Sequence, residues 1–512
     1  MPEKTILEGP KPHPTQMSQQ EQISHVLIFP LPVQGHVNSM LRLAELLCLS
    51  NLHVTFLNSV HNHDRLLRFS DIRTRFERYP GFVFETFPDG LPEDHPRSGD
   101  RVMDIFYAID GVAKPLIKEL FKRLVCDTVT PLTCVITDGA FEFVHEFAEE
   151  LGIPTICFRT ISCCSFWVYY CLPKLIEAGE LPLKGKEDLD RKIEKVPGME
   201  TILRGRDLPS FFRHSEINNR DVQLVLRANR ASSRAHALSL NTFEDIDALL
   251  LSHIRCHFPK VFTIGPLHAH LKSRLSRAAT TCDPSGGNSF WEEDKSCIPW
   301  LNTMPLKSVI YVSFGSITVL SKDQMFEFWH GLVNSGKPFL WVIRPDSIIR
   351  ENGSGHVPEE LLEATKKRGC MVEWVPQEEV LFHPAIGGFL THSGWNSTIE
   401  SMVAGVPMIC WPYFGDQQTN SRLVSEVWKV GLDMKDTCDR LIVEKMVRDL
   451  MDERREDFLQ ATKEISEMAR KSVNEGGSSY LNLDRLVEEI RLMRVQPLHS
   501  TGQIECHQTE NI

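Results

Sequence analysis

The sequence has no long run of hydrophobic residues. No window approaches the ~18 consecutive apolar residues of a membrane-spanning helix, and residues 1–22 are polar, without the apolar stretch of a secretory signal. Basic residues are also too few to balance the acidic ones, since 56 Lys and Arg face 68 Asp and Glu and the formal net charge is -12. The basic surface that nucleic acid or an anionic membrane attracts is therefore missing. We expect a cytoplasmic protein that binds neither.

Metal-binding and disulfide patterns are missing too. The 14 cysteines include no C-x-x-C pair, and scattered cysteines in a cytoplasmic chain favour buried reduced thiols over a disulfide framework or a zinc site. Short D-x-D and H-x-H pairs do occur, but the first lie in charged segments predicted to be at the surface, and the second lack a third ligand. We therefore expect no metal at Asp188 and Asp190, Asp245 and Asp247, His61 and His63, or His268 and His270.

Short apolar segments rich in β-branched residues alternate with longer helical patterns along the chain. Strands that are apolar throughout and separated by helices are typical of parallel sheets covered on both faces. At 512 residues the chain exceeds one usual core, and the pattern predicts two doubly wound α/β domains. The predicted strands are 25–31, 53–59, 82–87, 132–138, 154–160, 235–242 and 261–266 in the first half, and 308–316, 338–343, 370–375, 387–392 and 407–412 in the second.

The pattern is interrupted between the two halves. Residues 267–295 are basic, then Gly/Ser-bearing and then acidic, with little apolar periodicity, so we predict a linker there. Near the C-terminus, 481–494 has the apolar stripe of an amphipathic helix that must pack on another element. The predicted division is a disordered extension 1–22, an N-terminal domain 23–266, the linker 267–295, a C-terminal domain 296–480, the helix 481–494 and a disordered tail 495–512.

A first candidate site lies at the ends of two strands in the N-terminal half, because ligands bind outside the carboxyl ends of open parallel sheets. The turn after the first strand contains Gln34, Gly35 and His36, and Asp138 ends another strand. An imidazole can take up a proton near neutral pH, and a carboxylate on its far nitrogen fixes the tautomer and stabilises the imidazolium. His36 and Asp138 together can therefore activate a hydroxyl. A solvated His36 and an Asp138 that only caps a helix are the alternatives.

A second candidate site begins where strand 387–392 leads into a helix. The stretch THSGWNSTIE (391–400) places Gly394, where a backbone can approach a ligand, among several hydrogen-bond donors. The free N–H groups and the positive dipole end of a helix N-terminus bind phosphate. The sequence predicts such a site, and a plain capping cluster is the alternative. Its donors are His392, Asn396 and Ser397, with Ser316 at the end of strand 308–316.

From Trp374 to Gln417 the chain closely resembles the signature box of plant secondary-product glycosyltransferases that use UDP-sugars. Further similarity lies in the QGHVN turn, the SFGS strand end and the VPGM…LRGRDLPSFF segment (196–212), so the resemblance spans roughly 24–494. It implies the GT-B fold, in which two Rossmann-like domains face each other across a cleft. It also implies that the acceptor binds mainly in the first domain and the donor mainly in the second, and that the last helix crosses back to the first.

The resemblance implies a role in donor binding for each matching position. The uracil ring is expected to stack on Trp374 beside the backbone of Val375. The ribose hydroxyls are expected on the side chains of Gln377 and Glu400. The diphosphate is expected on His392, Asn396 and Ser397, with Ser316 nearby. The glucose hydroxyls are expected on the side chains of Asp416 and Gln417, and Thr160 is expected near glucose O6. The backbone of Trp395 is expected beside the sugar. A glutamine at the final position is similar to enzymes that use glucose.

The same resemblance matches His36 to the family's base and Asp138 to its supporting acid. It implies one in-line displacement that inverts the anomer, giving a β-glucoside, with UDP-glucose as co-substrate and no metal or other cofactor. We also expect a monomer. Ser39, where the family often has proline, and Val375 are small departures that remove no chemical group.

The acceptor remains open between several classes. The aromatic residues Phe166, Trp167, Tyr169 and Tyr170 line an apolar acceptor pocket together with 89–105, or else belong to the core. The overall likeness is to plant glucosyltransferases that act on iridoids and related terpenoids, which implies a terpenoid hydroxyl or carboxylate; a phenolic or flavonoid acceptor is the alternative. A nicotinamide-dependent oxidoreductase would need G-x-G-x-x-G where the chain has PVQGHVNS. A non-catalytic nucleotide-sugar-binding protein would keep the donor box without turnover.

Overall fold

A computed structural model of the chain describes residues 23–127, 129–213, 216–277, 287–348, 359–366 and 368–493. The two segments predicted to be disordered, 1–22 and 495–512, lie outside the described residues.

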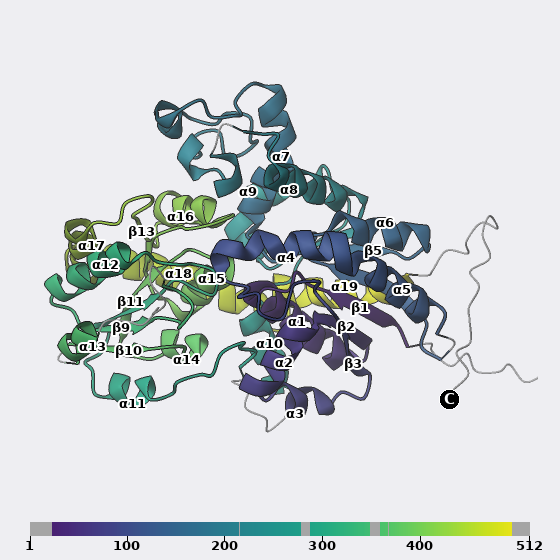
Figure 1. Cartoon of the computed structure of the whole chain (residues 1–512), viewed down its shortest axis with the longest axis horizontal. Helices are drawn as coiled ribbons and strands as arrows, with labels where there is room; N and C mark the ends of the chain where they lie inside the picture. The colour runs from purple at the N-terminus through teal and green to yellow at the C-terminus, as the bar shows by residue number, and fades with distance from the viewer. Residues whose placement is uncertain are drawn as a thin grey trace, which may run out of the picture.

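Two parallel sheets form the frame of the molecule (Figure 1). The first sheet has the strand order β3-β2-β1-β4-β5-β6-β7 and the second has β10-β9-β8-β11-β12-β13. The first sheet contains β1 (His25–Phe29), β2 (His53–Ser59), β3 (Phe82–Phe87), β4 (Leu132–Thr137), β5 (Thr155–Arg159), β6 (Ala237–Leu240) and β7 (Val261–Thr263). The second contains β8 (Val309–Ser313), β9 (Phe339–Val342), β10 (Gly369–Val372), β11 (Ile386–Thr391), β12 (Met408–Cys410) and β13 (Gly431–Asp433).

Every predicted strand is present, and the prediction of two doubly wound α/β domains is confirmed. The edge strand β13 was missed. Its three residues, GLD, contain a glycine and an aspartate and only one apolar side chain, so they carry no strand pattern of their own. The strand forms because its backbone pairs in parallel with β12.

Helices cover both faces of each sheet. In the N-terminal half they are α1 (Gln34–Leu49), α2 (Val60–Phe69), α3 (Ile72–Glu77), α4 (Val102–Ala108), α5 (Lys114–Val125), α6 (Glu142–Glu150), α7 (Cys163–Glu177), α8 (Arg220–Ala231) and α9 (Glu244–Arg255). They continue with α10 (Leu267–Arg277), α11 (Cys297–Asn302), α12 (Lys322–Asn334), α13 (Glu359–Thr365) and α14 (Gln377–Leu381). The last are α15 (Trp395–Ala404), α16 (Gln417–Glu426), α17 (Arg440–Arg448), α18 (Arg455–Val473) and α19 (Ser478–Leu492).

Strand β1 shows why apolar strands imply covered sheets. Its side chains alternate between the two faces, with Val26 and Ile28 in a cluster that includes α1 and Leu27 and Phe29 in a cluster with α5 and α6. All four side chains are fully buried. Both faces of the sheet are therefore hydrophobic core, as expected for a parallel sheet.

The last helix returns to the N-terminal sheet. Helix α18 packs on α15 of the C-terminal half, and α19 then contacts β7 and β4 (yellow in Figure 1). The predicted apolar stripe of α19 shares one hydrophobic cluster with β1 and α1. Its members are Leu483, Leu486, Val487, Ile490 and Met493. This packing explains the stripe, because an exposed helix would not need it.

Part of the predicted linker is structured. Residues Leu267–Arg277 form helix α10, which lies against α1. Its buried face consists of Leu267, His268, His270, Leu271 and Leu275. The helix was not predicted because two of the buried positions are histidines, so the apolar residues alone show no helical periodicity.

Other predictions about single residues have mixed outcomes. The prediction that Asp247 lies at the surface is wrong, since it is buried and accepts hydrogen bonds from the Thr242 hydroxyl at 2.5 Å and the Cys164 thiol at 3.3 Å.

Eleven described cysteines are free, as predicted, but Cys126 is disulfide-bonded. Of the aromatic patch, Phe166, Trp167 and Tyr169 belong to the core. The core alternative therefore describes them.

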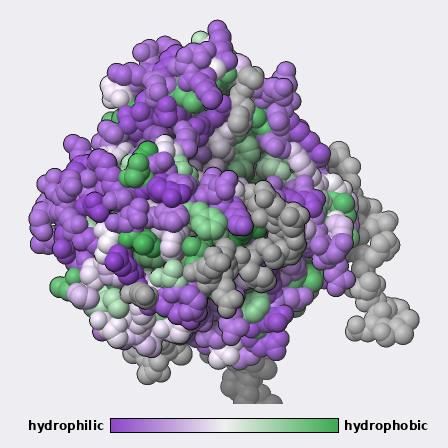
Figure 2. Space-filling model, turned by 60° about the vertical axis from the view of Figure 1, so that its left-hand side comes forward, coloured by the Kyte–Doolittle hydropathy of each residue, from purple (hydrophilic) through white to green (hydrophobic). Residues whose placement is uncertain are grey.

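The surface seen in Figure 2 is mostly hydrophilic. On the face shown in Figure 2, hydrophilic residues predominate and hydrophobic ones occur in small separate groups. Within the described ranges, no helix is long and apolar enough to cross a membrane. No group of three His, Cys, Asp or Glu side chains in that part of the chain is placed to hold a metal ion.

Candidate active site

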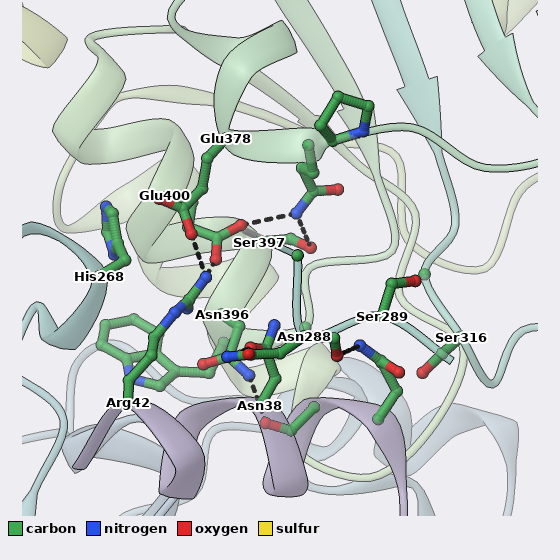
Figure 3. A pocket seen from close by; sticks show the side chains of 18 of the residues that line it. Asn38, Arg42, His268, Asn288, Ser289, Ser316, Glu378, Asn396, Ser397 and Glu400 are labelled. Carbon is green, nitrogen blue, oxygen red and sulfur yellow. Dashed lines mark hydrogen bonds and ion pairs between the residues drawn. The ribbon is translucent and has the colours of Figure 1, made fainter. Parts of the chain in front are cut away.

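A cavity of about 910 Å³ lies between the two domains, and its size falls in the ~300–1,000 Å³ range of small-molecule sites. Every predicted donor-binding residue lines it, and Asp138 lies behind the lining residue His36. Figure 3 shows part of this cavity, with α1 approaching α15 from the opposite domain. The lining donor residues are Thr160, Ser316, Trp374, Val375, Gln377, His392, Trp395, Asn396, Ser397, Glu400, Asp416 and Gln417.

The sheet topology explains this convergence. The strand order reverses between β1 and β4 in the first sheet and between β8 and β11 in the second. Each of these strand pairs ends in register, and ligands bind at such reversal points in open parallel sheets. His36 and Asp138 follow the first pair, and Ser316 and His392 follow the second. Four distant segments of the sequence thus meet at one cleft.

His36 and Asp138 form a hydrogen-bonded pair. Nδ1 of His36 lies 2.8 Å from Oδ2 of Asp138, whose side chain is fully buried while that of His36 is 25% exposed. The carboxylate is fixed further by the backbone N–H of Leu31 on Oδ2 and by that of Ala140 on Oδ1 at 2.9 Å. A carboxylate on Nδ1 places the proton on that nitrogen and leaves Nε2 as an acceptor.

The alternative that Asp138 caps a helix is wrong, because helix α6 begins at Glu142 and its N-cap residue is Phe141, not Asp138. Thr160 also reaches the imidazole, with Oγ1 2.9 Å from Nδ1 of His36. It lines the cavity directly after β5. The residue predicted to lie near the sugar therefore touches the imidazole as well.

Helix α15 starts at the cavity without a side-chain cap. Gly394 is the N-cap residue, and among the residues that the structure describes no side chain caps the first N–H groups. The capping-cluster alternative is therefore wrong, and these donors remain available for a ligand. The residue before the cap, Ser393, has a left-handed φ of 64°, a conformation that costs of order 1 kcal/mol outside glycine and clusters at ligand sites.

His392 is held closely between two glycines. A Cβ atom on Gly315 or on Gly394 would lie 2.4 Å from its imidazole, so larger residues at either position would displace the ring. Burial, together with the nearby charge of Arg344, lowers the pKa of His392 to about 4. The imidazole is thus neutral in the free protein, and among the described residues its Nδ1 has no hydrogen-bond partner.

The side-chain amide of Gln377 contacts two polar residues of α15. Nε2 of Gln377 donates to Oγ of Ser397 at 3.0 Å and to Oε2 of Glu400 at 2.8 Å. Glu400 is 4% exposed, and burial raises the pKa of its carboxyl group. Ser397 and Glu400 lie on one face of α15, one turn apart, and Gln377 contacts both from the start of α14.

Trp374 lies at one end of the cavity and contacts a second tryptophan. Its ring centre is 4.8 Å from that of Trp291, with the planes 31° apart. The guanidinium of Arg65 lies 4.7 Å from the other ring, Trp291, which is within reach for a cation–π interaction. An aromatic wall of this kind suits a flat base.

Asp416 and Gln417 close the cavity where α16 begins. Oε1 of Gln417 accepts the backbone N–H groups of Tyr413 at 2.8 Å and Phe414 at 2.9 Å. Oδ2 of Asp416 accepts Nδ2 of Asn420 at 2.8 Å. The loop before α16 is thus fixed by the side chain of Gln417, whose amide nitrogen is left for a ligand.

The two domains bind each other around the cavity. Nδ2 of Asn396 donates to the carbonyl of Gly35 at 2.8 Å, and the hydroxyl of Ser39 donates to Oδ1 of Asn396 at 2.7 Å. A proline at position 39 has no hydroxyl for this bond. The indole N–H of Trp395 donates to the carbonyl of Asn241 at 2.8 Å. The departure at Ser39 therefore adds a contact between domains.

Other residues line the cavity although the sequence analysis did not single them out. Two of them are Arg42, on α1, and Asn288, in the predicted linker. Asn288 donates to Oδ1 of Asn38 at 3.0 Å and accepts from Arg75 at 2.9 Å. Neither residue belongs to a spacing pattern, so only the folded structure shows that they line the site.

Comparison with known proteins now identifies the family. The model of the family described as "UDP-glucoronosyl and UDP-glucosyl transferase" matches residues 293–458. Over 470 residues the chain is 57% identical to a 7-deoxyloganetic acid glucosyltransferase of Catharanthus roseus, an alignment that covers 91% of this chain and 97% of the relative. The chain belongs to this family. It is a UDP-glycosyltransferase.

Two further relatives of the UDP-glycosyltransferase are informative. A myricetin 3-O-rhamnoside 1,2-glucosyltransferase of Crocosmia x crocosmiiflora is 43% identical, over 95% of this chain and all of the relative (100%). The crystal structure of Os79 from O. sativa in complex with UDP superposes with a TM-score of 0.76 at 26% identity, covering 91% of this chain and 100% of that one. The predicted GT-B fold of the UDP-glycosyltransferase is therefore confirmed.

Proposed function

We propose that this UDP-glycosyltransferase transfers glucose from UDP-glucose to a hydroxyl or carboxylate of a small apolar plant metabolite, an iridoid or another terpenoid. The product is a β-glucoside or a glucose ester. The observation that carries the proposal is the hydrogen-bonded pair of His36 and Asp138, which shares one cavity with the uncapped start of α15. A base and a diphosphate site on opposite walls are what an in-line displacement needs.

When the acceptor is a hydroxyl, Nε2 of His36 accepts its proton while the oxygen forms a bond to the anomeric carbon of glucose. A carboxylate acceptor is already ionised and forms this bond without losing a proton. The bond from this carbon to the UDP oxygen breaks, and UDP leaves with the electron pair. Attack opposite to the leaving group inverts the anomer. Asp138 stabilises the imidazolium through Nδ1 at 2.8 Å, and the imidazolium then releases the proton to solvent.

The reaction also requires that the negative charge on the leaving diphosphate be stabilised. The free N–H groups of α15, the dipole of that helix and the side chains of His392, Asn396 and Ser397 favour the developing negative charge. With Ser316 beside them, these donors support transfer without a metal ion. Activity that is unchanged by a chelator is the expected result.

The remaining groups orient the donor in this proposal. Trp374 and the backbone of Val375 hold uracil, and Gln377 and Glu400 hold the ribose hydroxyls. The glucose hydroxyls bind Asp416, Gln417 and Thr160, with the backbone of Trp395 beside them. All of these residues line the cavity. The proposal also includes a monomeric enzyme in the cytoplasm.

The acceptor class rests on the relatives. The relative from Catharanthus roseus, at 57% identity, is named for 7-deoxyloganetic acid, which favours an iridoid acid. The flavonoid glycoside in the name of the Crocosmia relative, at 43% identity, supports a phenolic or flavonoid acceptor as the second candidate. A protein that only binds nucleotide sugars is the remaining alternative, and it has no use for the pair of His36 and Asp138.

Substitution of the proposed base tests the reaction. Since general base catalysis contributes roughly 100- to 10,000-fold, His36→Ala should lower kcat by that factor with UDP-glucose and an iridoid that accepts glucose on a hydroxyl. The affinity for UDP, measured by calorimetry, should stay within about 3-fold of the native value, because the imidazole takes no part in holding the nucleotide. Near-normal transfer by His36→Ala would exclude His36 as the base.

A further inference from the structure

The side chain of Arg42 crosses from the N-terminal domain into the donor site. It extends from α1, is 8% exposed, and donates from Nη1 to Oε1 of Glu400 at 3.0 Å. Its Nη2 group donates to Oε1 of Glu378. Figure 3 shows Arg42 directed from α1 toward the two carboxylates of the opposite domain.

The two carboxylates differ in their surroundings. The side chain of Glu400 is 5% exposed, whereas that of Glu378 is 41% exposed and can be solvated by water. Among the residues that the structure describes, Arg42 is the only cation that pairs with Glu400. A buried carboxylate depends on such a partner, because an unpaired one takes up a proton.

We propose that Arg42 is a positioning residue for the ribose of the donor: from the opposite domain, it keeps the carboxylate of Glu400 ionised and correctly oriented for the ribose hydroxyls. This inference rests on the ribose-binding role proposed for Glu400. Gln377 holds Oε2 and Arg42 holds Oε1. Each oxygen therefore retains an acceptor position for a ribose O–H.

The charges around Glu400 explain why Arg42 is needed. Burial raises the pKa of Glu400, and the nearby Glu378 raises it too, while Arg42 opposes both effects. Other charged or titratable groups also face this pair. Arg75, His268, Lys272 and Glu293 interact with Glu378, and Tyr311 interacts with Glu400. Burial lowers the pKa of His268 to about 4, so this imidazole is neutral and cannot replace Arg42. Without Arg42, Glu400 takes up a proton at a higher pH and loses its strength as an acceptor.

The proposal has a readout that a general loss of structure does not produce. We compare the affinity for UDP with that for 2′,3′-dideoxy-UDP, both measured by calorimetry on the full chain. Hydrogen bonds to charged groups contribute about 10- to 150-fold and those between neutral groups about 2- to 10-fold. The native enzyme should prefer UDP by about 100-fold, and Arg42→Met should reduce this preference to about 10-fold or less.

The variants separate charge from packing. Arg42→Lys keeps the cation and should keep the preference within about 3-fold of the native ratio. Arg204→Met is the matched control, since Arg204 also pairs with a buried carboxylate, Asp207, and neither residue lines the cavity. It should leave the preference unchanged. If Arg42→Met does not fold, Arg42→Gln keeps hydrogen-bond donors without the charge and should show the same reduction.

The pH dependence gives a second test with the same two ligands. In Arg42→Met, the preference for UDP should rise as the pH rises, because Glu400 then ionises within the measured range. Ionisation of the phosphate affects both ligands and cancels in the ratio. A pH-independent, native preference in Arg42→Met would overturn the inference. Failure of the native enzyme to bind UDP would instead count against the proposed function.

Discussion

Replacement of Asp138 by asparagine tests whether its carboxylate supports catalysis or only anchors a loop. Oδ2 accepts from Leu31 and lies against His36, while Oδ1 accepts the N–H of Ala140. An amide offers only one oxygen. With that oxygen on His36 and Leu31, its NH₂ group faces the N–H of Ala140, so one buried hydrogen bond is lost.

The size of the effect follows from these contacts. Leaving one buried donor unsatisfied costs about 1–3 kcal/mol of stability, which lowers the melting temperature by a few degrees at about 2–4 °C per kcal/mol. The bond to His36 also changes from charge-assisted to neutral, and the imidazolium of the transition state loses its counter-charge. We expect kcat to fall about 10- to 100-fold, equivalent to about 1.4–2.8 kcal/mol.

The assay measures UDP release with saturating UDP-glucose and acceptor, beside thermal melts. Asp247→Asn is the matched control, because Asp247 is also a buried aspartate of the N-terminal domain and does not line the cavity. It should lower the melting temperature slightly and leave kcat unchanged. If Asp138→Asn lost stability but kept kcat within about 2-fold, Asp138 would be a loop anchor and the reasoning about the pair would be refuted.

Two further predictions concern the diphosphate site and acid stability. Gly315→Ala and Gly336→Ala both place alanine at a left-handed φ, but only Gly315→Ala puts a Cβ 2.4 Å from His392. Both variants should lose about 1 kcal/mol of stability. Only Gly315→Ala should bind UDP at least ~10-fold more weakly. Equal affinities would contradict the packing argument. Several buried histidines have pKa values lowered to about 4, so the unfolded chain binds more protons between that pH and ~6.5. Stability should therefore fall as the pH drops from ~6.5 towards 4, by roughly 1 kcal/mol per histidine at pH 5.5, and a melting temperature that stays flat over this range would argue against it. The four histidines are His145, His268, His270 and His392.

The frame of the fold could be predicted because its signals are local. Strands such as β1 and β8 are continuous apolar runs, and the stripe of α19 has helical spacing. The short edge strand β13 could not be predicted, since only its pairing with β12 defines it. Helix α10 escaped because buried histidines occupy positions that are usually apolar.

That the residues expected to bind the donor line one cavity could be predicted, since most of them lie in one continuous stretch from Trp374 to Gln417 that resembles the family's signature box. The contact of Arg42 with Glu400 from the opposite domain could not, although His36 and Thr160 of that domain were expected at the cleft. Arg42 and Asn396 contact partners more than 350 positions away in sequence, and such contacts have no local pattern. The buried position of Asp247 was misread because charged neighbours on one helix suggest exposure, whereas tertiary packing decides it.

The central claim is that the chain catalyses inverting transfer of glucose to an iridoid acid. The most direct test is to incubate the enzyme with UDP-glucose and panels of iridoid, phenolic and flavonoid acceptors, and to determine the products by mass and by the NMR coupling of the anomeric proton. We predict a β-glucoside or β-glucose ester of an iridoid acid, with UDP released in equal amount. An α-linked product, or tight UDP binding without acceptor-dependent release, would contradict the mechanism, and turnover of flavonoids alone would contradict the acceptor.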